Sequence, residues 1–317
     1  MDKNLALEFV RVTEAAAIEA ARFIGKGNKI AADKAAVDAM RKWFNTIDFS
    51  GTIVIGEGSK DKAPELYTGE RVGNGKGPEM DIAVDPLECT DSVAFGRYNA
   101  LTVITTGPRH SLLMAPDTYM WKIAVGPAAK DVIDLDAPVK DNIAKTAKAL
   151  GKDIEEITVC VLDRPRHEKL IHEIRESGAR LRMISDGDVA VAVATCQKEN
   201  PIDMLIGTGG STEGVLAAVA VKILGGAIHI RFQPRNEADS KKMDELDIKK
   251  DKIYTTEDLA KGDFLSFTAT GVIDGPLLAG VNFTSDYIIT HSVVMRSASK
   301  TVRYLTTHHH PESKKFK

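Results

Sequence analysis

The sequence predicts an α/β protein in which mixed sheets are covered by helices. Stretches with apolar residues at steps of three and four, typical of amphipathic helices, alternate with short apolar runs typical of buried strands. The alternation is most regular in the second half, where helices of about 10 to 13 residues separate the strands. Turns containing glycine, proline or aspartate follow most of these strands. Such alternation is typical of parallel or mixed sheets with helices on their faces.

The first half of the chain begins with two predicted helices. Leu5, Phe9 and Val12 lie on one face of the first helix, and residues 25–28 end it, because glycine readily adopts the left-handed conformation past a helix terminus. The second helix is predicted over residues 31–44. Short strands are then predicted over 52–55, 81–85, 101–105 and 121–125.

The second half predicts a separate α/β region. Helices are predicted over 140–150, 166–176, 188–196 and 212–224, and strands over 157–162, 180–184, 203–206 and 227–232. Late strands near 265–270 and 287–295 are expected to pair with this second sheet. Residues 238–252 are expected to form a solvated linker or exposed helix, and His308–His310 a solvated tail.

We place the domain boundary within residues 130–150. This division gives an N-terminal α+β domain for metal binding and catalysis over 1–140. It gives a C-terminal α/β substrate domain over 141–317, and the active site is expected at the junction of the two.

Composition and charge exclude several classes of protein. The 317 residues include 42 Lys and Arg against 45 Asp and Glu, a formal net charge of −3, so binding to nucleic acid through bulk positive charge is not expected. No apolar run approaches the roughly 20 residues that span a bilayer, and no signal-peptide pattern is present. The three cysteines have neither disulfide-framework nor zinc-site spacing. We therefore expect a cytoplasmic globular protein without a nucleic-acid or membrane partner.

Carboxylates follow the ends of two predicted buried strands. Glu57 comes after the first of these strands, and Asp85 and Glu88 come at the end of the next. Pro86 has no N–H and a fixed φ, so the backbone must turn there and can bring both acidic side chains toward one point. Ligands bind outside the carboxyl ends of strands in α/β sheets, and Mg²⁺ and Mn²⁺ prefer oxygen ligands. The pattern favours a divalent-metal site, with hydrated acids at an ordinary turn as the alternative.

Thr90 adds a hydroxyl beside these carboxylates. Such a hydroxyl can orient a water for attack on phosphorus, or simply cap the next helix. In the second half, the Gly-rich run 207–214 opens a helix whose backbone N–H groups can bind phosphate, and Glu213 can supply a metal oxygen. Groups suited to a second phosphate or to sugar hydroxyls follow other strands: Arg164, Arg166, Tyr119, Asp186 and Asp188. Together these residues indicate metal-assisted chemistry on a phosphorylated polyol.

Seven motifs carry a family resemblance. They are GNKIAAD at 27–33, VIGEG at 54–58, DPLECT at 85–90, APDTYM at 115–120, RPRH at 164–167, DGDVA at 186–190 and GGSTEG at 209–214. In this order and spacing, over essentially the whole chain, they resemble the class II (GlpX-type) fructose-1,6-bisphosphatases. The resemblance implies a lithium-sensitive, metal-dependent sugar or inositol phosphatase with a layered α/β/α/β/α fold. It implies the gluconeogenic hydrolysis of the 1-phosphate of fructose 1,6-bisphosphate.

The resemblance also implies roles for individual residues. Thr90 would position the attacking water, with Asp61 as its carboxylate partner and Lys29 beside the scissile phosphate. The ligands of Mn²⁺ or Mg²⁺ would be Asp33, Glu57, Asp85, Glu88 and Glu213. The sugar bisphosphate would contact Glu88, Cys89, Thr90, Tyr119, Arg164, Pro165, Arg166, Asp186, Gly187, Asp188 and Gly210. We expect a homo-oligomer, either a dimer or a tetramer.

The sequence departs from the usual family pattern in three places. Cys89 stands where the family usually has glycine, Asn28 replaces an aspartate, and Ser211-Thr212 replaces Ala-Pro. The Cβ of Cys89 would crowd the phosphate or require a backbone angle that glycine tolerates better. One alternative is a related phosphatase for sedoheptulose 1,7-bisphosphate or an inositol phosphate. Another, because of Cys89, is a catalytically weak sugar-phosphate binding protein. A nucleotide-binding module built on residues 207–214 is the least favoured alternative.

Overall fold

The computed structural model describes residues 5–57 and 66–310. Helices and strands alternate as the sequence predicts, and the α/β class is confirmed. The chain forms two compact units, one containing residues up to Leu112 together with those from Gly262 onward, and the other containing Leu113–Lys261. None of the helices in the described ranges is long and apolar enough to cross a membrane.

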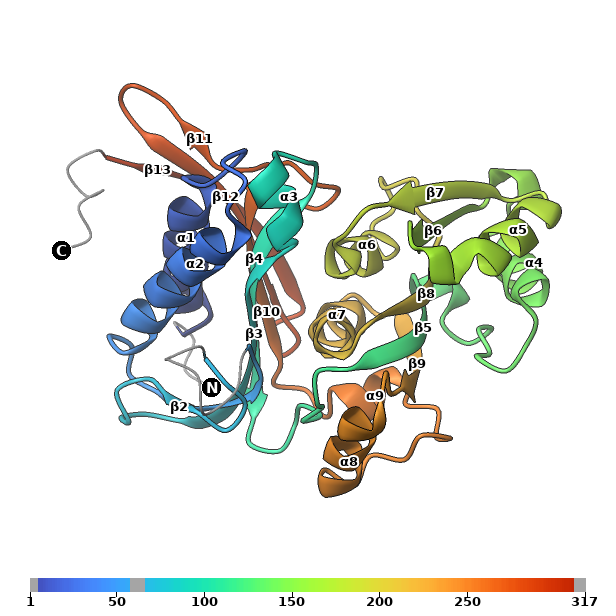
Figure 1. Ribbon diagram of the computed structural model, residues 1–317, viewed down its shortest axis with the longest axis horizontal. Helices are drawn as coiled ribbons and strands as arrows, with labels where there is room; N and C mark the ends of the chain where they lie inside the picture. Colours follow the sequence, from blue (N-terminus) through green and yellow to red (C-terminus); the bar gives the residue numbers. More distant parts are fainter. Residues whose placement is uncertain (1–4, 58–65, 311–317) are drawn as a thin grey trace. The chain divides into compact units, whose positions relative to one another are not determined.

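The first unit is built on an eight-stranded sheet with helices packed on it (Figure 1). Its elements are α1 (Leu5–Ala21), α2 (Lys29–Phe44), β1 (Ser50–Ile55), β2 (Arg71–Val72), β3 (Glu79–Glu88), α3 (Thr90–Phe95), β4 (Ala100–Pro108), β10 (Ser266–Ile273), β11 (Asn282–Phe283), β12 (Ile288–Arg296) and β13 (Thr301–His309). The strand order is β11-β12-β10-β4-β3-β1-β2, with β13 paired to β12. Strands β1 and β3 are parallel neighbours, whereas β3 and β4 are antiparallel.

Aromatic packing joins α1 to the end of α2 and to Phe49 just before β1, and a buried hydroxyl joins α1 to the sheet. Phe9 meets Phe44 and Phe49 edge to face, with ring centroids 6.1 and 5.3 Å away, a geometry that the ring quadrupole favours. On the same helix, the Thr13 carbonyl accepts a hydrogen bond from Thr102 Oγ1 at 3.0 Å. The sheet and helix are therefore held by specific polar contacts as well as by apolar burial.

The second unit is built on a five-stranded sheet in the order β7-β6-β8-β5-β9. Its elements are β5 (Tyr119–Val125), α4 (Val139–Leu150), β6 (Thr158–Leu162), α5 (Glu168–Glu176), β7 (Arg180–Ile184), α6 (Asp188–Ala194), β8 (Met204–Gly210), α7 (Ser211–Ile223), β9 (Ala227–Gln233), α8 (Glu237–Glu245) and α9 (Thr256–Leu259), with short 3-10 turns η1 (Pro127–Ala129), η2 (Ile154–Glu156) and η3 (Pro165–His167). Strand β6 is parallel to β7 and β8, and β5 is antiparallel to β8 and β9. Figure 1 shows α4 and α5 on one face of this sheet and α6 and α7 on the other.

The late strands correct the expected organisation. They do not pair with the second sheet: β10 pairs with β4, and β12 pairs with β10. In Figure 1 the red strands of the chain's end lie beside the blue-green strands of its beginning. Conversely, β5 lies in the second unit because it pairs with β8 and β9. The compact units thus differ from the expected domains 1–140 and 141–317, since long-range pairing rather than local composition sets their limits.

Two further segments differ from expectation. The histidines at 308 and 309 belong to β13, and Thr290 Oγ1 lies 2.9 Å from His309 Nε2, so the expected solvated tail is wrong at these positions. Residues 207–210, the first part of the Gly-rich run expected to follow the strand and open a helix, form the end of β8. The expected exposed helix within 238–252 is confirmed as α8, although this helix also buries Asp239 and Met243.

Candidate active site

Three of the predicted carboxylates of the first unit lie near the ends of two adjacent parallel strands. Ile55, the last residue of β1, lies opposite Ala83 of β3. Glu57 follows β1 and is half-buried, whereas Asp85 and Glu88 in β3 are only 7% and 3% exposed. Buried carboxylates at this edge agree with the rule that ligands bind beyond the carboxyl ends of strands.

Pro86 does not end its strand as expected; it lies in a bulge. Asp85 pairs with Val103 and Glu88 with Leu101, so β3 gains one residue relative to β4. The backbone N–H of Leu87 donates to Asp85 Oδ1 at 3.1 Å and closes the local turn. A bulge tolerates proline because one residue there makes no ladder hydrogen bond. The predicted change of backbone direction at Pro86 is present, but within a continuous strand.

Cys89 joins the bulge to helix α3 in a left-handed conformation. Its φ is +75° and its ψ +52°, and its side chain makes no capping hydrogen bond. A non-glycine residue in this region is strained because its Cβ approaches the backbone. The expectation that this position demands an angle suited to glycine is confirmed.

Helix α2 presents the predicted residues Lys29 and Asp33. Asn28 caps the helix by accepting a hydrogen bond from Ala31 N at 3.0 Å. Lys29 Nζ lies 3.2 Å from Asp91 Oδ1, next to the half-buried Thr90 at the start of α3. Asp33 is half-buried one helical turn beyond Lys29. Lys29 therefore reaches the first turn of the helix that carries Thr90.

The donor set of the first unit fits a hard divalent cation, because its oxygens are all carboxylate. Among the residues that the structure describes, however, no three His, Cys, Asp or Glu side chains are gathered closely enough to hold a metal ion. Asp61 lies outside the described residues. The metal ligands consequently stay predictions.

In the second unit the predicted substrate residues gather at one edge of the sheet. Arg164–Arg166 follow β6, Asp186–Asp188 follow β7, and Gly210 ends β8. These three strands are parallel, so their carboxyl ends share that edge. Tyr119 joins them because it begins the antiparallel strand β5, directly opposite Gly210.

Two guanidinium groups flank Tyr119. That of Arg166 lies 4.7 Å from the ring centroid and that of Arg235 5.5 Å, distances typical of cation–π contacts. Arg166 also donates from Nε and Nη2 to the Thr208 carbonyl, at 3.2 and 2.8 Å. Sequence reasoning identified Arg166 and Tyr119 but missed Arg235.

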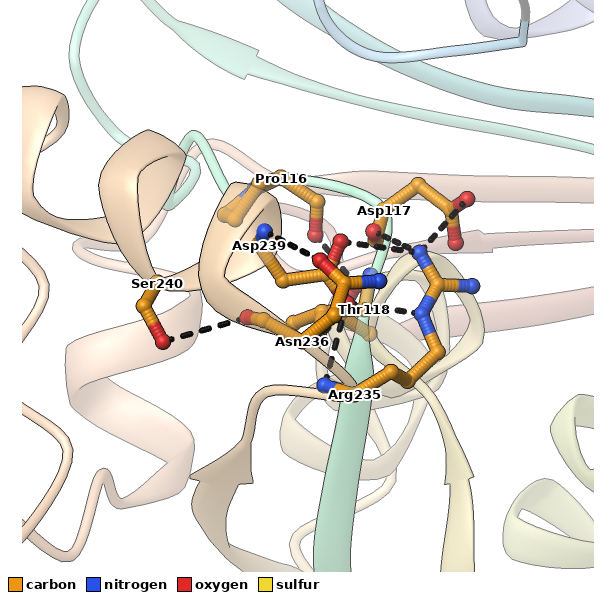
Figure 2. Close-up of polar contacts among 8 residues, drawn as sticks. Pro116, Asp117, Thr118, Arg235, Asn236, Asp239 and Ser240 are labelled. Carbon is orange, nitrogen blue, oxygen red and sulfur yellow. Dashed lines mark hydrogen bonds and ion pairs between the residues drawn. The ribbon is translucent and has the colours of Figure 1, made fainter.

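Arg235 is held by two carboxylates (Figure 2). Its Nε donates to Asp239 Oδ2 at 2.7 Å, and its Nη2 lies 3.2 Å from Asp117 Oδ2. The hydrogen bond from Arg235 lowers the pKa of Asp239 to about 2. The four-residue spacing of Arg235 and Asp239 at the start of a helix is the sequence signal that could have predicted this ion pair. This cluster ties α8 to the segment that leads into Tyr119.

Arg164 and Asp186 form a looser pair at the same edge. Arg164 Nη2 lies 3.9 Å from Asp186 Oδ1, and both side chains are about a third exposed. Gly187 has a φ of +85° at the start of α6, which glycine adopts without strain. These exposed groups are accessible to a ligand.

Glu213 lies among buried charges. Burial, together with the negative charge of Asp188, raises the pKa of Glu213 to about 7, and the positive charge of Lys122 opposes this shift. A Cβ on Gly210 would lie 2.0 Å from Glu213 Oε2, so this glycine allows the carboxylate to fold back onto the strand end. Lys122, the remaining charge of the group, was missed because it stands in an otherwise apolar strand.

Ser211, one of the departures from the family pattern, has a defined structural role. Its Oγ donates to the Pro116 carbonyl at 2.6 Å and accepts from Thr118 N at 3.0 Å. The hydroxyl therefore links the start of α7 to the segment before Tyr119.

Comparison with known proteins shows the family. Residues 3–309 match the family described as bacterial fructose-1,6-bisphosphatase, glpX-encoded. The chain is 42% identical over 323 residues to "Fructose-1,6-bisphosphatase class 2" of Haemophilus influenzae, covering 98% of this chain and 97% of the relative. It is 41% identical over 327 residues to "Fructose-1,6-bisphosphatase 1 class 2" of Escherichia coli K12, covering 99% and 97%. The chain belongs to the glpX-encoded family of bacterial fructose-1,6-bisphosphatases.

Proposed function

We propose that this chain hydrolyses the 1-phosphate of fructose 1,6-bisphosphate, releasing fructose 6-phosphate and phosphate with the help of Mn²⁺ or Mg²⁺. The family membership over nearly the whole chain supports the reaction class. The observation that carries the proposal is the common edge of β6, β7 and β8, where arginines, aspartates and Tyr119 face the same end of one sheet.

The carboxylates Asp33, Glu57, Asp85, Glu88 and Glu213 are proposed to hold the metal ions. When bound, such ions neutralise phosphate charge and lower the pKa of bound water. The buried positions of Asp85 and Glu88 restrict their side-chain freedom, so less entropy is lost when they bind a cation. The location of the active site at a domain junction stays a prediction.

Thr90 is proposed to orient the water that attacks phosphorus, with Asp61 as its carboxylate partner. Its place in the first turn of α3, next to the Lys29–Asp91 pair, supports this role. Lys29 can exchange Asp91 for a phosphate oxygen, because its ammonium group is more than half exposed. Glu88, Cys89 and Thr90 would then contact the 1-phosphate.

The edge of the second unit is proposed to bind the rest of the substrate. Arg164 and Arg166 supply guanidinium groups, whose geometry matches phosphate. Asp186 and Asp188 can accept hydrogen bonds from sugar hydroxyls, and Tyr119 is kept in place by the guanidinium of Arg166. Pro165, Gly187 and Gly210 shape the backbone between these groups.

The first test is phosphate release from fructose 1,6-bisphosphate with Mn²⁺, beside the same reaction in EDTA. We expect metal-dependent release and fructose 6-phosphate as the sugar product. The kcat/KM should exceed that for sedoheptulose 1,7-bisphosphate or an inositol monophosphate. A folded, metal-loaded sample that binds the sugar but releases no phosphate would contradict the proposal.

A homo-oligomer, dimer or tetramer, and a cytoplasmic location are also proposed. Light scattering of the purified protein measures the first, and fractionation of the native cells the second. A monomer over the assayed concentration range would contradict the proposed assembly.

A further inference from the structure

Lys122 is a fully buried cation with two specific partners. It lies in β5, its side chain is 2% exposed, and its Nζ lies 2.7 Å from Asp188 Oδ2. The same Nζ donates to the Gly210 carbonyl at 3.1 Å. One ammonium group therefore contacts both the start of α6 and the end of β8. Both partners are among the residues predicted to bind the substrate.

The backbone covers this ion pair closely. A Cβ on Gly209 would lie 2.2 Å from Asp188 Oδ2 and 2.9 Å from Lys122 Nζ. Only a residue without a side chain allows the strand to pass so near the two charges. The Lys122–Asp188 pair is thus held in position by the close backbone of Gly209 as well as by its hydrogen bonds.

Asp188 uses only one of its oxygens in this arrangement. Its side chain is 5% exposed, and in the described part of the chain its Oδ1 has no hydrogen-bond partner. A buried carboxylate oxygen without a partner is costly unless a ligand or water satisfies it. Lys122 therefore holds Oδ2 and leaves Oδ1 available as an acceptor.

We propose that Lys122 is a positioning residue for the sugar-binding edge: it holds Asp188 so that Oδ1 accepts a hydrogen bond from a substrate hydroxyl. It also fixes the Gly210 carbonyl at the end of β8, to which the same ammonium group donates. The inference rests on the proposed function, because it assumes that a sugar phosphate binds at this edge. Lys122 itself is buried against the backbone of Gly209 and acts through its two partners, Asp188 and the Gly210 carbonyl.

A second lysine of the same unit provides a matched control. Lys152 Nζ lies 2.6 Å from Asp203 Oδ1. Asp203 is nearly as buried as Asp188, at 8% against 5% side-chain exposure, although Lys152 itself is 37% exposed. The other oxygen, Asp203 Oδ2, accepts from Thr158 N at 2.9 Å. Asp203 stands just before β8, at the end of the strand opposite to Gly210. This pair is complete without a ligand, so its loss should affect folding stability alone.

The experiment compares Lys122→Met with Lys152→Met in the full-length, Mn²⁺-loaded enzyme. Circular dichroism first establishes that each variant is folded at the assay temperature. For Lys122→Met we expect KM for fructose 1,6-bisphosphate to rise about 10- to 100-fold, the scale of a lost charge-assisted hydrogen bond, with a much smaller change in kcat. Lys152→Met should keep the wild-type KM.

Lys122→Met leaves Asp188 as a buried charge without its partner, which can unfold the protein. A double variant tests the proposal in that case. Lys122→Met/Asp188→Asn removes both charges and is compared with Asp188→Asn alone. If Lys122 acts through Asp188, the double variant should have the same KM as Asp188→Asn alone, because the effects of coupled residues do not add.

Three results would overturn the role of Lys122 in an active wild-type enzyme. They are an unchanged KM in Lys122→Met, an equal rise in KM in Lys152→Met, and full additivity in the Asp188→Asn background. An inactive, folded wild-type enzyme would instead overturn the proposed function, and this inference with it.

Discussion

His167 Nε2 accepts a hydrogen bond from the backbone N–H of Thr208 at 2.8 Å. The other ring nitrogen, Nδ1, lies 2.7 Å from the Leu162 carbonyl, so the proton resides on Nδ1 and the ring is neutral. His167 is 1% exposed and joins the ends of β6 and β8, where the predicted substrate residues gather. Burial, aided by the charges of Arg166 and Arg164, lowers the pKa of His167.

This lowered pKa predicts a loss of stability in acid. The native state binds fewer protons than the unfolded state, so the contribution of His167 is fully present above its usual pKa of about 6.5 and is lost as the pH falls below that value. The limiting slope is about 1.4 kcal/mol per pH unit. We expect the free energy of unfolding of wild type to exceed that of His167→Asn by less at pH about 5.5 than at pH about 7.5, as measured by urea unfolding. The exposed His172 is the control, and an equal effect of His172→Asn would refute the assignment.

Ser211→Ala should destabilise the protein. The substitution leaves the Pro116 carbonyl and the Thr118 N–H buried without their hydroxyl partner, a loss of about 1 to 3 kcal/mol. Urea unfolding measures the difference. Ser240, whose hydroxyl donates to the Asn236 carbonyl at the surface, is the control, and Ser240→Ala should stay within about 0.5 kcal/mol of wild type. Equal stabilities of the two variants would contradict the bridging role of Ser211.

The left-handed backbone of Cys89 predicts that glycine is more stable than alanine at this position, the reverse of the usual order. At a φ of +75°, Cys89→Gly should be more stable than Cys89→Ala by about 1 kcal/mol, because glycine has no Cβ to strain. Cys160, which lies in β6 and is not at positive φ, should show the ordinary order with alanine more stable. Thermal unfolding of the four variants tests this, and a common order at both sites would exclude backbone strain at Cys89.

Thr90→Ala should lower kcat by about 10²- to 10⁴-fold, the range for lost general acid–base assistance. The folded structure should persist, since Thr90 is only half-buried. Thr90→Ser retains a hydroxyl and should keep most of the activity. Steady-state kinetics with saturating Mn²⁺ measures both variants, and a wild-type kcat in Thr90→Ala would remove this residue from the proposed mechanism.

Local patterns alone identified most helices and strands, and they also identified the residues at the strand ends. The apolar spacing of Leu5, Phe9 and Val12 determines a helical face wherever that helix packs, and Glu57 and Asp85 follow apolar runs whatever sheet those runs join. The family motifs then predicted which of these residues serve catalysis. Such signals are readable because each depends on neighbours within a few positions of the chain.

Tertiary structure alone decided which strands pair and which charges are buried. Strand β10 pairs with β4 although more than 150 residues separate Thr106 from Ser266, and no local periodicity encodes that partner. In the sequence Lys122 cannot be told from any other lysine in a strand, and only the fold brings it into contact with Asp188 and Gly210. His309 looks like part of a tail until β13 pairs with β12. The physical reason is that burial and pairing are properties of the folded surroundings, which segments distant in the sequence create together.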